Sequence, residues 1–444
     1  MLNYIWLALV VLAVLLGGWQ GRLPEVTAGA FDAVKMAVLE IAFPLIGITA
    51  LWLGMMRLAE RAGTVQLLAR VLRRPLRLLF PEVPAEHPAM GSMLMNLAAN
   101  MIGLNNAATP LGLRAMQDLE TLNPRPGTAT NAMCTFLALN TSSVQLVPMT
   151  AIAILAAQGA ARPGAIVSTA LLATLCSTAV GIAAVKLLER LPCFRLPPAP
   201  AGTPAEQRPA PATDTASPEA PPEKALAAPA PLTGWGRVVL GLFLVAFTLF
   251  FWRLMQQPPA ENDHDTWLLR GMNAVSVLAV PFLLALFPLY AALRRVPVYE
   301  EFVEGAKEGF QVAVKIIPFL VAMLVAIGMF RAAGGVDLLT RGLQPLLGWA
   351  GFPPELLPMA LTRPLSGSAT IGLFADLAHT LGPDHLVTRM GGTLLGSTET
   401  TLYVLAVYFG AVGIRRARHA VAAGLLADLA GIIASVLVCR WMWG

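Results

Sequence analysis

Apolar residues occur along this chain in long continuous blocks rather than at the spacing of an amphipathic helix. About 20 apolar residues in a helix cross the roughly 30 Å of hydrocarbon in a bilayer. Blocks of nearly this length or more lie at about 2–18, 36–56, 165–188, 236–252, 269–293, 311–330 and 420–442. No Lys or Arg precedes the first block and no typical cleavage site follows it, so we expect a retained helix there. The pattern predicts an all-α, polytopic membrane helix bundle.

Two further apolar regions, 88–160 and 354–412, have a different pattern. Gly, Pro, Asn, Ser and Thr interrupt the apolar residues throughout both regions. Such a composition suits broken or re-entrant helices that are buried inside a bundle, rather than smooth helices that face lipid. We therefore expect a helix break in each region.

A low-complexity stretch at 197–231, dominated by Pro and Ala, lies between these two regions. It shows no apolar period, so we expect a disordered and water-exposed linker. The predicted domains are a first membrane repeat at 1–196, a linker at 197–234, and a second membrane repeat at 235–444 with two leading helices.

The two halves share a sequence pattern. Pro44 and Pro318 each precede a Gly-Met pair by ten residues and an Arg by thirteen, at a constant offset of 274 residues. Both halves end in a long Ala/Leu/Val helix. Two segments between these points match in the same order, 105–109 with 366–370 and 140–145 with 396–401. The shared order indicates a duplication, with chance similarity between apolar helices as the alternative.

The distribution of arginine predicts the relative orientation of the two copies, because basic segments stay in the cytoplasm. After its first helix, the first copy carries six Arg between 57 and 77, and the second carries only Arg331 and Arg341. Before the last helix the bias reverses, with Arg162 alone against three Arg at 415–418. We therefore expect inverted repeats, a common transporter plan with its binding site near the midplane, and a cytoplasmic linker.

Composition and motifs exclude several classes of function. Only 13% of the residues are charged, about half the share in soluble proteins, and the mean hydropathy is +0.66. The net charge of +5 comes from Arg beside apolar blocks, so we expect no nucleic-acid partner. The four Cys and five His show no metal-ligand spacing, so we expect no disulfide framework, no metal and no cofactor. The usual catalytic motifs are absent from the sequence, so no enzyme is predicted.

The first of four polar clusters at membrane depth is rich in asparagine. Such side chains are costly in a bilayer unless they are paired. Asn105 and Asn106 lie between Gly103 and Pro110, which indicates an unwound break. Amides both donate and accept hydrogen bonds, so they suit a base, a sugar or an ion; interhelical hydrogen bonding is an equal alternative. The candidate substrate-binding residues are Asn100, Asn105, Asn106 and Thr109.

The second cluster places four short polar residues in a row between apolar flanks. These side chains would point to all sides of a regular helix, so a break is the better interpretation. The candidate residues are Asn140, Thr141, Ser142 and Ser143.

The third and fourth clusters add charge. Arg363 precedes a proline and a Ser-Gly-Ser segment, and a guanidinium at a helix end can hold a carboxylate or phosphate. Glu399 is surrounded by hydroxyls, and an intramembrane carboxylate suits an ion ligand, a proton carrier or a substrate contact. The alternatives are an interfacial Arg363, or structural pairs of Arg363 with Asp376 or Glu399 and of Glu399 with Arg389. The candidate residues are Arg363, Ser366, Ser368, Thr370, Ser397, Thr398, Glu399 and Thr400.

Long motifs around these clusters resemble known families. MLMNLAANMIGLNNAATPLGLRAMQDLE and NAMCTFLALNTSS resemble the spore maturation protein A family. PLSGSATIGLFADL and GSTETTLYVLAVYFGAVGIRRARHA resemble the spore maturation protein B family. The chain is similar to a fusion of the two, and both belong to the nucleoside recognition, or Gate, domain family. This resemblance covers nearly all of both halves apart from the linker and the extra helices, and it implies a transporter-like fold with broken helices and inverted repeats.

Together these features predict a secondary transporter or permease in the bacterial inner membrane that moves a small polar solute, nucleoside-like or another small metabolite. The site is expected between the Asn105/Asn140 region of the first half and the Ser366/Glu399 region of the second. Coupling to H⁺ or Na⁺ and a homo-oligomer remain open. The alternative is a non-transporting membrane scaffold or regulator of the envelope or of spore maturation.

Overall fold

The computed structural model describes residues 2–103, 105–194, 230–257, 266–335, 338 and 351–444. Most of the predicted linker 197–231, and Arg341, lie outside the described residues. The described part of the chain is helical and contains no strand; one isolated β-bridge joins Thr128 and Arg416. The predicted all-α fold is confirmed.

The first half begins with α1 (Leu2–Trp19) and a long continuous helix made of α2 (Leu23–Lys35), the π-helix η1 (Met36–Ala42) and α3 (Phe43–Arg61). It continues with α4 (Thr64–Leu79), α5 (Pro88–Ile102), α6 (Asn105–Thr121), α7 (Asn131–Ser142), α8 (Met149–Ala157), the short 3-10 helix η2 (Pro163–Ala165) and α9 (Ile166–Leu188).

The second half begins with the two extra helices α10 (Gly234–Met255) and α11 (Trp267–Leu293). It continues with α12 (Val298–Ala332), η4 (Pro354–Leu356), α14 (Leu357–Thr362), α15 (Gly367–Leu381), α16 (Leu386–Ser397), α17 (Thr401–Ala411) and α18 (Ala420–Trp443).

Five described helices are long and apolar enough to cross a membrane, which confirms the polytopic membrane architecture. They are Leu23–Arg61, Pro163–Leu188, Gly234–Met255, Trp267–Leu293 and Ala420–Trp443. The α12 helix differs from the expected block at 311–330, because it already begins at Val298 with charged turns. The charged residues of these turns end the apolar block in the sequence. The helix nevertheless extends through them because Glu301 and Glu308 pair with Arg57 and Arg61 of α3.

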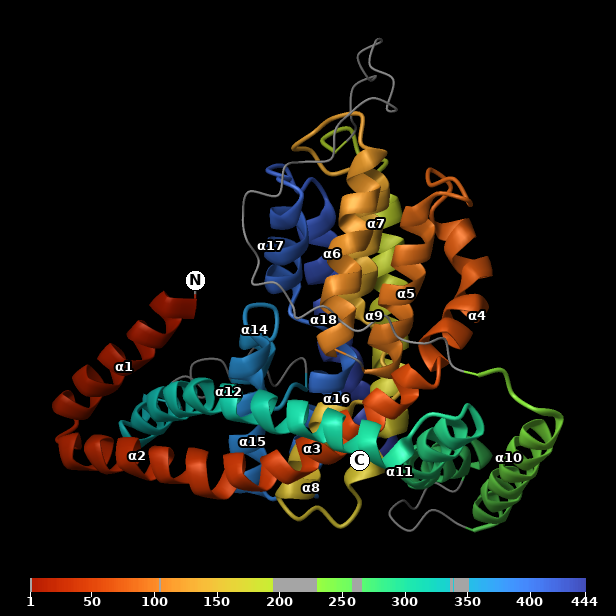
Figure 1. Ribbon diagram of the computed structural model, residues 1–444. Helices are drawn as coiled ribbons and strands as arrows, with labels where there is room; N and C mark the ends of the chain where they lie inside the picture. The colour runs from red at the N-terminus through yellow and green to blue at the C-terminus, as the bar shows by residue number, and fades with distance from the viewer. Residues whose placement is uncertain (1, 104, 195–229, 258–265, 336–337, 339–350) are drawn as a thin grey trace.

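The two halves form inverted repeats, in which α7, α8 and α9 correspond to α16, α17 and α18. The backbone N–H of Ala129, before α7, donates to the carbonyl of Arg416, after α17, at 3.0 Å. At the other end, the backbone N–H of Ala161, after α8, donates to the Asp384 carboxylate, before α16, at 2.9 Å. The two broken helices therefore run antiparallel. In Figure 1, α6 and α7 lie near α17 at one end of the bundle, and α8 lies near α15 and α16 at the other.

The α12 helix packs along the continuous helix formed by α2, η1 and α3, through small residues at equivalent positions. A Cβ atom on Gly54 would lie 2.7 Å from the Phe302 ring, and one on Gly328 would lie 2.8 Å from the Gly29 carbonyl oxygen. Gly54 and Gly328 are related by the same offset of 274 residues as the sequence repeat. Without side chains at these positions, the two backbones approach closely, as is usual for helix pairs in membranes.

An ion-pair network joins the end of α3 to the start of α12. The Glu301 carboxylate accepts hydrogen bonds from Arg57 at 2.8 Å and from Arg61 at 2.9 Å. Burial raises the pKa of the Glu301 carboxyl, but the hydrogen bonds from Arg57 and Arg61 outweigh burial and hold this pKa below its ordinary value. The network fixes the charged turns of α12 beside the basic end of α3.

Candidate functional site

Each repeat contains a helix break, and the two breaks meet inside the bundle. Between α7 and α8, Ser143 adopts a left-handed φ of 26° and Pro148 offers no backbone N–H, so the helix does not continue. Between α16 and α17, Thr398 and Thr400 are extended. The backbone N–H of Glu399 donates to the carbonyl of Thr141 at 2.7 Å. This bond joins the breaks of the two halves directly.

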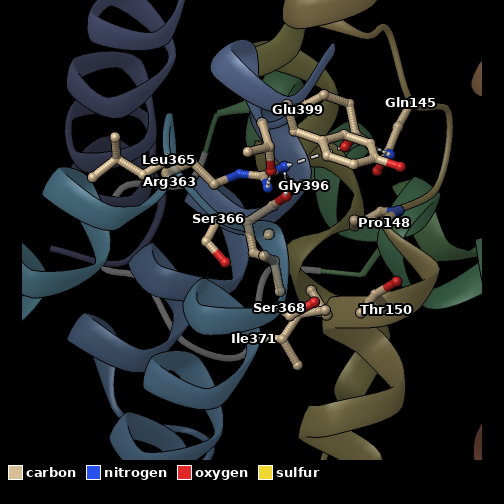
Figure 2. A pocket seen from close by; sticks show the side chains of 15 residues that line it. Gln145, Pro148, Thr150, Arg363, Leu365, Ser366, Ser368, Ile371, Gly396 and Glu399 are labelled. Carbon is tan, nitrogen blue, oxygen red and sulfur yellow. Dashed lines mark hydrogen bonds and ion pairs between the residues drawn. The ribbon is translucent and has the colours of Figure 1, made fainter. Parts of the chain in front are cut away.

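A cavity of about 470 Å³ opens beside this crossing (Figure 2). Both halves contribute to its wall: the break between α7 and α8, the turn before α15, and the break between α16 and α17. The lining residues are Gln145, Pro148, Thr150, Ala151, Arg363, Leu365, Ser366, Gly367, Ser368, Ile371, Leu395, Gly396, Glu399, Thr400 and Tyr403. A volume of this size accommodates a small metabolite.

Arg363 is buried in the wall of this cavity, with only 3% of the residue exposed. Its guanidinium donates to the Leu395 carbonyl at 3.1 Å and to the Thr400 hydroxyl at 3.4 Å. The closest approach to the Glu399 carboxylate is 4.0 Å, which is too long for a hydrogen bond. Arg363 therefore holds the second break chiefly through hydrogen bonds to Leu395 and Thr400.

The Glu399 carboxylate lines the cavity and is partly exposed. One of its oxygens accepts a hydrogen bond from the Gln145 side chain at 3.0 Å, and the side chain is 28% exposed. The other two expected pairs are not formed: Asp376 pairs with Arg331 rather than with Arg363, and Arg389 lies 3.6 Å from Asp384 rather than beside Glu399. A carboxylate with free acceptor positions can take N–H or O–H groups or a cation.

The first turn of α15 forms another part of the wall. Ser366 caps this helix by accepting the backbone N–H of Ala369 at 3.2 Å, and Ser368 lines the cavity. A Cβ atom on Gly367 would lie 2.9 Å from the Thr400 hydroxyl, so only glycine allows this close approach. The positive end of the helix dipole and the Arg363 guanidinium thus lie near each other, on the same wall as the Glu399 carboxylate.

Comparisons with known proteins also divide the chain into two related halves. The family described as "Nucleoside recognition", named Gate, matches residues 42–158 and 313–415, one region in each half. Spore maturation protein B of Bacillus subtilis (strain 168) is 46% identical over 173 residues, which are 39% of this chain and 97% of that protein. Spore maturation protein A of the same organism is 42% identical over 185 residues, 42% of this chain and 92% of that protein.

The chain belongs to the Gate family. It is a multi-pass, permease-like membrane protein with two Gate regions in one polypeptide. No solved structure shows a significant match.

The candidate residues of the second Gate region fall into two groups. Arg363, Ser366, Ser368, Glu399 and Thr400 line the cavity. The other three are buried behind it and do not line it: the Thr370 hydroxyl donates to Ser366, Ser397 donates to Leu394, and Thr398 is 1% exposed. They support the turns that carry the lining residues.

The candidate residues of the first Gate region whose side chains the structure describes lie outside the cavity wall. Asn100 donates to the Asn140 side chain at 2.9 Å, and Asn140 donates to the Phe136 carbonyl at 2.9 Å, so these amides join α5 to α7. Thr141, Ser142 and Ser143 are buried. The carbonyls of Ser142 and Ser143 accept hydrogen bonds from Thr174. In this arrangement the polar groups stabilise the first break, as the alternative interpretation proposed.

The predicted unwound segment in the first Gate region differs from the structure. The backbone of Asn105 and Asn106 is helical and begins α6, because Gly103, with a φ of 90°, ends α5 just before it. The side chains of Asn105 and Asn106 lie outside the described residues. Thr109 is partly buried on α6.

Three polar residues line the cavity although the sequence analysis did not select them: Gln145, Thr150 and Tyr403. Gln145 belongs to the segment 140–145 that matches the second copy, so the repeat itself could have identified it. Asp428 was also not selected; its buried carboxylate accepts a hydrogen bond from Thr401 and fastens α17 to α18.

Proposed function

We propose that this protein is a secondary permease of the bacterial inner membrane and that a small polar solute binds where the two breaks cross. The observation that carries the proposal is the cavity of about 470 Å³, because both Gate regions form its wall and Glu399 lies in it. The cavity resembles the midplane sites of inverted-repeat transporters, which are formed by discontinuous helices. The Gate family is associated with transport rather than catalysis, which supports the same proposal.

The chemistry of the wall defines the kind of solute. Glu399 and Gln145 offer acceptors and a donor, Ser366 and Ser368 offer hydroxyls, and Tyr403 offers a ring. A nucleoside-like molecule, or another small metabolite with several hydrogen-bonding groups, matches this set. The predicted cytoplasmic position of the linker remains part of this proposal.

A thermal-shift screen tests the proposal. Purified protein is heated with nucleosides, nucleobases, dicarboxylates, short peptides, Na⁺ or divalent cations. A ligand at a hundred times its dissociation constant stabilises the folded state by about 2.7 kcal/mol, which raises the melting temperature measurably. We expect one chemical class to stabilise the wild-type protein and to lose this effect in Glu399→Gln.

The matched control is Glu304→Gln, which removes an exposed carboxylate that pairs with Lys307. This variant should respond to the solute like the wild-type protein. If no compound stabilises the wild-type protein, or if Glu399→Gln responds fully, the solute site is not at Glu399.

A further inference from the structure

The α4 helix carries an unusual set of side chains for a helix at the edge of a membrane bundle. It contains Arg70, Arg73, Arg74 and Arg77 and no acidic residue. Its buried face, with Val65, Ala69 and Leu76, packs on the core beside α3 and α5. In Figure 1, α4 lies at the edge of the bundle. Its opposite face is exposed within the described part of the chain, at residues 66–67, 70–71, 73–75 and 77–78.

The exposed part of α4 has an apolar stripe. Leu67, Val71 and Leu78 are spaced by four and seven residues, which places them on one face of the helix. They are 48%, 67% and 84% exposed. Large apolar side chains with this exposure are unfavourable in water but favourable in the outer hydrocarbon of a bilayer.

A basic stripe lies next to the apolar one. Arg70, Arg73 and Arg77 are spaced by three and four residues and share a face, and Arg74 lies at the border between the two stripes. Arg77 is 3.9 Å from Glu86, with both side chains exposed. Within the described residues, Arg70, Arg73 and Arg74 have no ionic or hydrogen-bonding partner. Within the described part of the chain, no acidic group neutralises these three charges.

The position of α4 along the chain identifies this partner. Only Ala62 and Gly63 separate it from α3, which ends the candidate span Leu23–Arg61, so α4 begins close to a membrane boundary. An amphipathic helix with Arg beside an exposed apolar stripe lies in the interface plane of a bilayer. Phosphate groups of anionic lipids complement its charge. We propose that α4 is a docking surface for anionic phospholipids, in which the apolar stripe enters the acyl boundary and the arginines bind headgroup phosphates.

Binding of fluorescent phosphatidylglycerol to the full-length protein in neutral detergent micelles tests this proposal, with phosphatidylcholine carrying the same label as the reference. Each arginine near an anionic surface contributes roughly 1 kcal/mol, or about fivefold in affinity. The triple variant R70Q/R73Q/R74Q should therefore bind phosphatidylglycerol at least about tenfold more weakly, while phosphatidylcholine binding stays unchanged.

Two further variants separate this surface from general charge and from misfolding. R70K/R73K/R74K keeps the charge and should keep most of the affinity. R190Q/R253Q/R416Q removes three exposed arginines elsewhere and should change the affinity less than about twofold. The proposal is overturned if the wild-type protein binds both lipids equally. It is also overturned if the control triple variant loses as much affinity as the α4 variant.

Discussion

Replacing Arg363 by methionine should separate the structural part of the site from the part that contacts solute. Methionine fills a similar volume but leaves the Leu395 carbonyl and the Thr400 hydroxyl without their donor. A hydrogen bond from a charged donor contributes about 1.5–3 kcal/mol. Because the bond to Thr400 is long, most of the loss comes from the bond to the Leu395 carbonyl, and we expect Arg363→Met to lower the free energy of unfolding by about 2–3 kcal/mol.

Glu399→Gln should cost far less stability. The charges of Arg363 and Glu399 are 4.0 Å apart, and Glu399 is partly exposed and already accepts a bond from Gln145. A pair at this distance contributes between about 1 kcal/mol in water and about 4 kcal/mol near a protein surface. We expect a loss of about 1–2 kcal/mol, because water screens the exposed side of the carboxylate.

A double-mutant cycle measures both effects by denaturant unfolding in mixed micelles, followed by tryptophan fluorescence. Lys307→Met serves as the control, since Lys307 and Glu304 form an exposed pair, with side chains 66% and 49% exposed, and should cost less than about 1 kcal/mol. Equal losses for Arg363→Met and Glu399→Gln, with no further loss in the double variant, would refute the reasoning. That result would make the two residues a structural pair.

Two other variants test the packing and the charges between α3 and α12. Gly54→Ala should destabilise the protein by about 1–3 kcal/mol, because the new Cβ would lie 2.7 Å from the Phe302 ring. Gly47→Ala on the same helix is the control: its Cβ would have no other atom within 4 Å, so this variant should be neutral or slightly stabilising. The lowered pKa of Glu301 predicts stability that is fully present above the unfolded pKa of about 4.3 and is lost as the pH falls through the lower folded value. Melting curves across this range should show a smaller pH dependence for Glu301→Gln, and an equal dependence would contradict the role assigned to its pair with Arg57.

The sequence could predict the architecture because membrane constraints leave strong local signals. Apolar blocks marked most spans, and the arginine bias predicted the inversion that the Ala129–Arg416 and Ala161–Asp384 contacts show. A break in each region was also predictable from its Gly, Pro and polar content, but its place was not. Asn140, Thr141 and Ser142 still belong to the regular helix α7, which is buried on all faces, and the break begins at Ser143. The start of α12 was missed because its charged turns depend on partners in α3.

The composition of the site was harder to predict, because hydrogen-bond partners depend on the tertiary fold. Local sequence makes both Asn140 and Glu399 candidates for binding a solute. The structure pairs Asn140 with Asn100 and leaves Glu399 at the cavity. Gln145 was not selected because its contact with Glu399 across the two halves exists only in the tertiary fold, although the repeat segment 140–145 could have identified it.

Cysteine accessibility in liposomes tests the central claim most directly, namely that the two breaks enclose an aqueous cavity within the membrane. In a chain with its four native cysteines replaced by alanine, Ser368→Cys and Thr150→Cys line the cavity, whereas Leu437→Cys is exposed on the membrane-spanning α18. We expect a charged, membrane-impermeant methanethiosulfonate to modify the first two positions from one side of the membrane and to leave the third unmodified. Protection of both cavity positions from both sides, in folded protein, would contradict the account.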